Sequence, residues 1–74
     1  MNEFAAWRKA KELSQDEAAA ILKVDRTTVS KWETGKALPR PDLFPKIIET
    51  YKITSDEIIS VITSRNQNQS VKAG

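Results

Sequence analysis

The sequence predicts an all-α fold built as a bundle of five short helices. Two capping boxes, Ser14-x-x-Glu17 and Thr54-x-x-Glu57, mark helix starts, because a hydroxyl and a carboxylate together satisfy backbone N–H groups of the first turn. Apolar residues recur at helical spacing, and prolines and a glycine separate the periodic segments. At 74 residues the chain has the length of one small domain.

The first two helices are expected from their apolar faces and their caps. Residues 2–11 form an amphipathic segment in which Phe4 and Trp7 lie three residues apart on one face. The second helix begins at the Ser14 capping box and continues through alanines, which are the best helix formers. It is expected to end near Leu22.

The third helix has a predicted cap at each end. Asp25 is its expected N-cap, the helix covers Arg26–Thr34, and Gly35 is placed where a left-handed residue ends a helix. Val29 and Trp32 lie three residues apart and are predicted to face inward. The remaining positions are polar, and their serine and threonines are mediocre helix formers.

A loop and two more helices complete the bundle. Residues 36–41 are expected to be a loop because their prolines disfavour helix. The fourth helix is predicted over about Leu43–Lys52, with Asp42 as N-cap and Pro45 in the first turn, where a missing N–H costs little. The fifth begins at the Thr54 capping box, which favours helix despite the β-branched residues that follow.

The helical signals and the composition change near the end of the chain. Residues 1–63 contain all the periodic segments, whereas residues 64–74 are polar and rich in amides. We therefore predict one domain over 1–63 and a disordered C-terminal tail over 64–74.

The composition excludes several classes of chemistry. The chain has no cysteine and no histidine, so it offers no disulfide, no thiolate nucleophile and neither of the commonest nitrogen and sulfur metal ligands. Glycine is scarce, so no glycine-rich phosphate loop is present. We expect no enzyme, no cofactor and no metal. No apolar run has the length of a signal peptide or a membrane span, which predicts a cytoplasmic protein without a membrane partner.

The segment SQDEAAAILKVDRTTVSKWETG, residues 14–35, resembles the helix-turn-helix of the lambdoid phage repressor and Cro family, also called the XRE family. The matching positions agree in order and spacing, and they are Ser14, Gln15, Glu17, Ala19, Val24, Val29, Trp32, Glu33 and Gly35. The resemblance extends over about Phe4 to Ile59. It implies a five-helix domain that binds DNA and is usually a dimer.

The resemblance also implies two structural features. Arg8 and Glu33 match the family's ion pair between the first and third helices. Lys23 stands where the family usually has glycine, in a turn with left-handed backbone. Because that conformation costs an L-residue about 1–2 kcal/mol, either Lys23 is strained or the turn differs locally.

The third helix is the implied recognition helix, whose first turns read base edges in the major groove. The residues expected to read bases are Arg26, Thr27, Ser30 and Lys31. Those expected to contact phosphates are Gln15, Thr28, Lys36 and Arg40. Arginine and lysine suit guanine, and threonine suits thymine. The alternative for each residue is a solvated helix face. Three acidic residues nearby are interpreted as helix-start residues: Asp16, Glu17 and Asp25.

The fifth helix has more aliphatic surface than one core stripe requires. Ile59 and Val61 are the residues beyond that stripe, and they predict a weak homodimer that binds a near-palindromic operator. The alternative is that these side chains belong to the monomer core.

These observations favour a sequence-specific, double-stranded DNA-binding transcription regulator of phage or bacterial type. The short chain predicts a Cro-like repressor that acts by occupying an operator, although help to polymerase from a neighbouring site is an equal possibility. The alternative is a protein-interaction module of the same fold, such as an antitoxin or an antirepressor-like partner. The modest net charge of +2 decides little between them.

Overall fold

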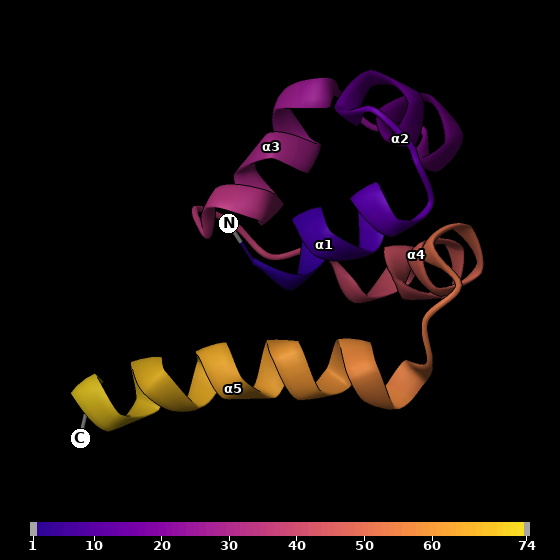
Figure 1. Ribbon diagram of the computed structural model, residues 1–74. Coiled ribbons are helices and arrows are strands. Elements are labelled where there is room, and N and C mark those ends of the chain that lie inside the picture. Colours follow the sequence, from indigo (N-terminus) through magenta and orange to yellow (C-terminus); the bar gives the residue numbers. More distant parts are fainter. Residues whose placement is uncertain (1, 74) are drawn as a thin grey trace.

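Five α-helices and one 3-10 turn follow one another in the computed structural model, which describes the backbone of residues 2–73 and the side chains of residues 2–65. They are α1 (Glu3–Ala10), α2 (Gln15–Leu22), α3 (Arg26–Thr34), η1 (Pro41–Leu43), α4 (Phe44–Tyr51) and α5 (Ser55–Ala73), shown in Figure 1. No strand occurs within residues 2–73, and the predicted all-α fold is confirmed.

Three helix ends have the predicted chemistry. In the capping box of α2, Ser14 Oγ accepts from the Glu17 N–H at 3.0 Å and Glu17 accepts from the Ser14 N–H at 2.8 Å. The box at Thr54 and Glu57 has the same pair of bonds at the start of α5. Gly35 ends α3 in the left-handed region, with φ of 81°. These local signals define the start of α2, the end of α3 and the start of α5.

Two predicted N-caps are different in the structure. Asp42 does not cap α4, because the 3-10 turn η1 occupies residues 41–43 and Leu43 precedes the helix without a side-chain cap. Asp25 does precede α3 in extended conformation, but its side chain makes no capping hydrogen bond. The prediction for Asp42 failed because Pro41 starts a tighter turn one residue before it.

The turn between α2 and α3 has the left-handed conformation of the family, with lysine in place of glycine. Lys23 has φ of 59° and ψ of 45°, and the Val24 N–H donates to the Ala19 carbonyl at 3.0 Å to close the turn. Of the two alternatives, Lys23 is the strained residue and the turn is not altered. The strain corresponds to about 1–2 kcal/mol.

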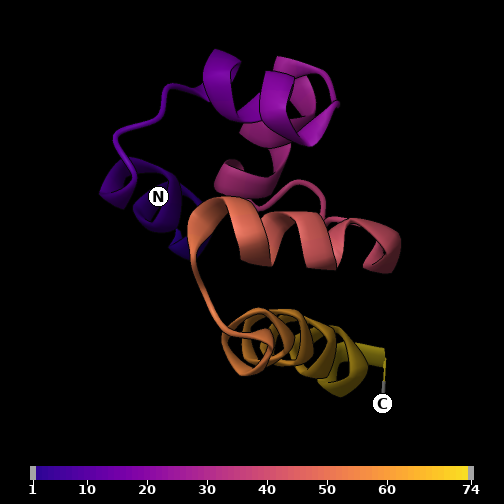
Figure 2. The ribbon, with the colours of Figure 1, turned by 90° about the vertical axis from the view of Figure 1, so that its right-hand side faces the viewer.

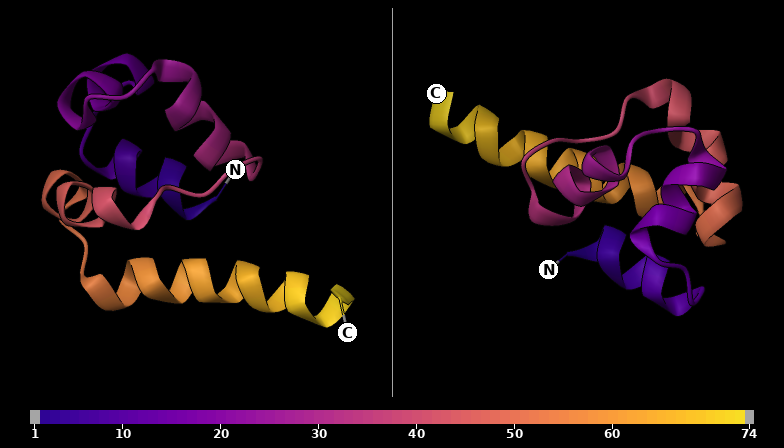
Figure 3. Two further views of the ribbon diagram at one scale, coloured as in Figure 1. Left: turned by 180° about the vertical axis from the view of Figure 1, so that it is seen from behind. Right: turned by 90° about the horizontal axis from the view of Figure 1, so that it is seen from above.

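The helices form three levels, with α1 and α4 between the α2–α3 pair and α5 (Figures 1 and 2). The view from behind shows α2 and α3 on the side of the molecule away from α5 (Figure 3, left). The core between these levels contains Phe4, Ala18, Ala19, Leu22, Val29, Trp32, Ile47, Tyr51, Ile53, Ile58 and Val61. Ala18 and Ala19 of α2 are buried in this core, and their small side chains let α3 approach closely.

Helix α5 corrects one of the predicted surface residues. Ile59 is 52% exposed, as expected of a residue outside the core stripe, but Val61 is only 9% exposed and belongs to the core. Val61 faces inward because it follows the fully buried Ile58 by three residues, which is nearly one helical turn. The placement of Val61 on an outer dimer surface was therefore wrong.

The helix α5 continues to Ala73, beyond position 63, where the sequence predicts the domain to end. The side chains of residues 66–74 lie outside the described residues. The predicted disorder of residues 64–74 stays a prediction.

Candidate nucleic-acid interface

The outer face of α3 presents the predicted base-reading side chains together. Arg26, Thr27 and Lys31 are exposed and Ser30 is half-buried. These four residues line a shallow hollow of about 250 Å³ with Thr34 and Lys36. The opposite face of α3 is anchored by Val29 and Trp32, which are 0% and 2% exposed. The core thus holds the helix in one orientation and leaves its polar face to solvent.

The hollow is cationic. Arg26, Lys31 and Lys36 are among its lining residues, and no acidic residue lines it. Just outside it, Asp16 in the first turn of α2 approaches Arg26, with 3.5 Å between Oδ1 and Nε. The sequence interpretation of Asp16 as a helix-start residue missed this contact, because the two residues belong to different helices.

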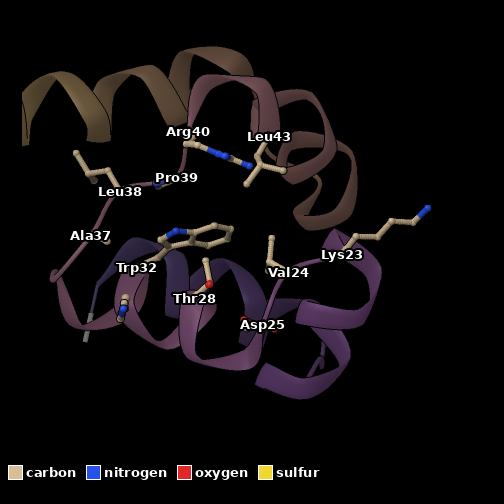
Figure 4. Close-up of a pocket in the computed structure, with 11 residues that line it drawn as sticks. Lys23, Val24, Asp25, Thr28, Trp32, Ala37, Leu38, Pro39, Arg40 and Leu43 are labelled. Atoms are coloured by element: carbon tan, nitrogen blue, oxygen red, sulfur yellow. The ribbon is translucent and has the colours of Figure 1, made fainter.

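A larger open groove of about 690 Å³ lies between α3 and the segment 37–43 (Figure 4). The Trp32 indole lies at its floor and the Arg40 side chain extends across its mouth (Figure 4). Thr28 also lines this groove, so two of the predicted phosphate-contacting residues share it. The Arg40 guanidinium is exposed and lies 3.6 Å from the Asp42 carboxylate.

The other two predicted phosphate contacts lie elsewhere. Lys36 lines the hollow together with the four predicted base-reading residues, and it does not line the groove. Gln15 is the first residue of α2, and its side-chain amide donates to Glu33 Oε1 at 3.0 Å. This bond links α2 to α3, and nothing in the sequence indicated it.

Behind α3, Arg8 and Glu33 form a buried ion pair between α1 and α3. Arg8 Nε donates to Glu33 Oε2 at 2.6 Å and Arg8 Nη2 donates to Oε1 at 3.0 Å, which is a bidentate contact. The remaining Nη1 donates to the Leu13 carbonyl at 2.7 Å. The pair is 8% and 6% exposed. It joins α1 to α3.

The ionisation of this pair follows from its contacts. Burial alone would raise the pKa of Glu33, but the hydrogen bonds from Arg8 and Gln15 and the Arg8 charge outweigh it, so the pKa is lowered. The hydrogen bond to Glu33 raises the pKa of Arg8 against the opposing effect of burial. Burial, with a further contribution from the Glu33 charge, raises the pKa of Tyr51 to about 12. Both members of the ion pair are therefore charged at neutral pH.

No group of three or more acidic, histidine or cysteine side chains in the described part of the chain is placed to hold a metal ion. None of its helices is long and apolar enough to cross a membrane.

Comparison with known proteins identifies the class that this geometry defines. Residues 4–58 match the family model described as helix-turn-helix. The chain therefore belongs to the XRE-type helix-turn-helix family of DNA-binding transcription regulators.

One relative is the HTH-type transcriptional activator BcrR of Enterococcus faecalis, which is 40% identical over 53 residues. The match covers 72% of this chain and 26% of BcrR, so the chain spans about a quarter of that relative's length. No solved structure gives a significant match.

Proposed function

We propose that this protein binds double-stranded DNA sequence-specifically through α3 and regulates transcription by occupying an operator. The observation that carries the proposal is the cationic hollow on the outer face of α3, lined by all four predicted base-reading residues. In the helix-turn-helix family a helix in this position enters the major groove. The proposal includes no catalytic activity.

The side chains on the outer face of α3 carry hydrogen-bonding groups that suit the edges of bases. Arg26 and Thr27 begin the helix and Lys31 follows Thr27 by one turn, so these side chains address neighbouring base pairs. Arg26 and Lys31 suit guanine O6 and N7, and Thr27 offers a hydroxyl and a methyl group to thymine. Ser30 lies half-buried on the same face and serves as a shorter hydrogen-bonding contact.

The phosphate contacts are assigned to Gln15, Thr28, Lys36 and Arg40. Gln15 stands at the N-terminus of α2, where backbone N–H groups and the helix dipole attract an anion. Lys36 and Arg40 are exposed cations on either side of the segment that follows α3. Contacts of this kind give affinity without sequence preference.

A salt titration tests this assignment. Affinity for a duplex should fall steeply with salt, and Lys36→Ala or Arg40→Ala should weaken all duplexes about equally and reduce the salt slope by roughly one unit each. Lys52→Ala is the matched control, since Lys52 is an exposed lysine that lines neither the hollow nor the groove. An affinity independent of salt, or an equal effect of Lys52→Ala, would contradict the phosphate contacts.

We further propose that the regulator is a Cro-like repressor, which excludes polymerase while it occupies its operator. The name of BcrR as an activator favours a second possibility, in which the same DNA contact assists polymerase from a neighbouring site. A reporter with the selected operator placed over the promoter or just upstream separates the two. Repression in the first position without activation in the second supports the repressor, and activation in the second position contradicts it.

We propose a weak homodimer on a near-palindromic operator, with the exposed Ile59 of α5 in the interface. Ile59→Asp should give a folded monomer of reduced operator affinity, measured by sedimentation and circular dichroism on the same samples. A wild-type protein that is monomeric at high concentration and binds a single half-site as tightly as a palindrome contradicts the dimer. Absence of duplex binding would instead favour the alternative protein-interaction module.

A further inference from the structure

The acidic residue beside the recognition helix suggests a means of setting base preference. We propose that Asp16 is a positioning residue that orients Arg26 toward one base pair and so determines specificity at that position. This inference rests on the proposed function, because it assumes that Arg26 reads a base. Asp16 acts through Arg26 and makes no base contact of its own.

The geometry of the pair leaves the reading atoms available. Asp16 Oδ1 lies 3.5 Å from Nε of Arg26, on the inner edge of the guanidinium. No other hydrogen bond or ion pair of Arg26 is found within the described residues, so both Nη groups are unengaged there. These two groups are the ones that make a bidentate contact with guanine O6 and N7.

The two residues are held by different helices of one rigid unit. Asp16 lies in the first turn of α2 and Arg26 is the first residue of α3. The backbones of α2 and α3 are held relative to each other because buried residues of both helices share one core, and the bond from Gln15 to Glu33 adds a polar link between them. The backbone that carries the carboxylate is therefore held beside the backbone that carries the arginine.

The energetics predict opposite effects on affinity and on discrimination. In water the pair is weak, because the side chains of Arg26 and Asp16 are 61% and 78% exposed. Bound DNA excludes part of that water and strengthens the contact, while the carboxylate repels nearby phosphates. An arginine that lacks the neighbouring carboxylate adopts more rotamers and reaches acceptors on wrong bases or phosphates. Asp16 should thus lower affinity for all DNA and raise preference for the correct base pair.

The experiment compares Asp16→Asn with the wild type on a duplex selected from a random pool and on its single-base variants. Discrimination at the base pair read by Arg26 should fall by about two- to tenfold, the range of an ion pair that becomes partly desolvated. Affinity for a random duplex should rise severalfold, and preferences at other base pairs should not change. Asp16→Glu, which keeps the carboxylate, should restore most of the discrimination.

The exposed pair Arg40–Asp42 provides a matched control. Its atoms are 3.6 Å apart and its arginine is assigned to a phosphate. Asp42→Asn removes the same charge and should raise affinity for every duplex without changing any base preference. If Asp16→Asn behaves in the same uniform way, Asp16 acts only through its charge and the inference is overturned. Melting curves verify that each variant is folded, and Asp16→Gln replaces Asp16→Asn should the latter not fold.

A double-mutant comparison separates this inference from the proposed function. In an Arg26→Ala background, Asp16→Asn should have no further effect on base preference. If Arg26→Ala itself leaves every preference unchanged, Arg26 does not read DNA, and both the role of α3 and the role of Asp16 are overturned. If Arg26→Ala loses one preference and Asp16→Asn loses none, only the inference fails.

Discussion

Replacing Glu33 with alanine should remove a large part of the folding free energy of this domain. The change takes away both carboxylate oxygens that Arg8 contacts and leaves the guanidinium its bond to the Leu13 carbonyl. Breaking a buried ion pair in this way costs about 3–5 kcal/mol. A domain of this length has a total stability of roughly 4–11 kcal/mol, so the variant is expected to be close to its unfolding threshold.

The reciprocal change, Arg8→Ala, leaves Glu33 buried without the bidentate contact and with the hydrogen bond from Gln15. The double variant Arg8→Ala with Glu33→Ala has no stranded charge, so its loss should be smaller than the sum of the two single losses by about 2 kcal/mol or more. Urea unfolding followed by circular dichroism at neutral pH measures all four proteins.

The exposed pair Arg40–Asp42 is the control cycle. Its side chains are 77% and 69% exposed, and its coupling should lie between about 0 and 1 kcal/mol. If the losses at Arg8 and Glu33 are additive within about 0.5 kcal/mol, the two residues do not stabilise each other and the reasoning is refuted.

Three further predictions concern single groups. Because the pKa of Glu33 is lowered from 4.5, its ionised form stabilises the fold. This contribution should be fully present above about pH 4.5 and should be lost as the pH falls below that value. Glu33→Gln should reduce the loss, as measured by urea unfolding at acid pH. The pKa of Tyr51 is raised to about 12, so stability should be lost as the pH rises from about 10 through 12, and Tyr51→Phe should abolish that loss. Since Tyr51 Oη is buried with no hydrogen-bond partner within the described residues, Tyr51→Phe should change stability by less than about 1 kcal/mol at pH 7, and a larger loss would indicate a missed partner. Lys23→Gly should raise the melting temperature, because it relieves about 1–2 kcal/mol of left-handed strain and this relief exceeds the entropic cost of glycine. Lys52→Gly, with φ of 57°, should do the same, and a decrease in both would contradict the strain.

Features that depend on neighbouring residues could be predicted from the sequence. The capping boxes at Ser14 and Thr54 and the helix end at Gly35 are formed within one turn of chain, so short patterns specify them. The resemblance to the family supplied the partner of Arg8, which lies on another helix and has no local signal.

Features that depend on the packing of distant elements could not be predicted in the same way. The sequence patterns contain no indication that Gln15 bonds Glu33 or that Asp16 approaches Arg26, because both contacts arise only when α2 crosses α3. Val61 was misplaced for the same reason: which face of α5 is buried depends on its docking against the other helices.

The most direct test of the central claim, that α3 reads bases, is selection of bound duplexes from a random pool followed by measurement of single-base variants. Arg26→Ala, Thr27→Ala and Lys31→Ala should each relax preference at a different base pair, by about 1–3 kcal/mol, while binding to random duplexes stays nearly intact apart from the lost charge. If all three variants lower affinity uniformly and leave every base preference unchanged, α3 does not read the groove and the claim is contradicted.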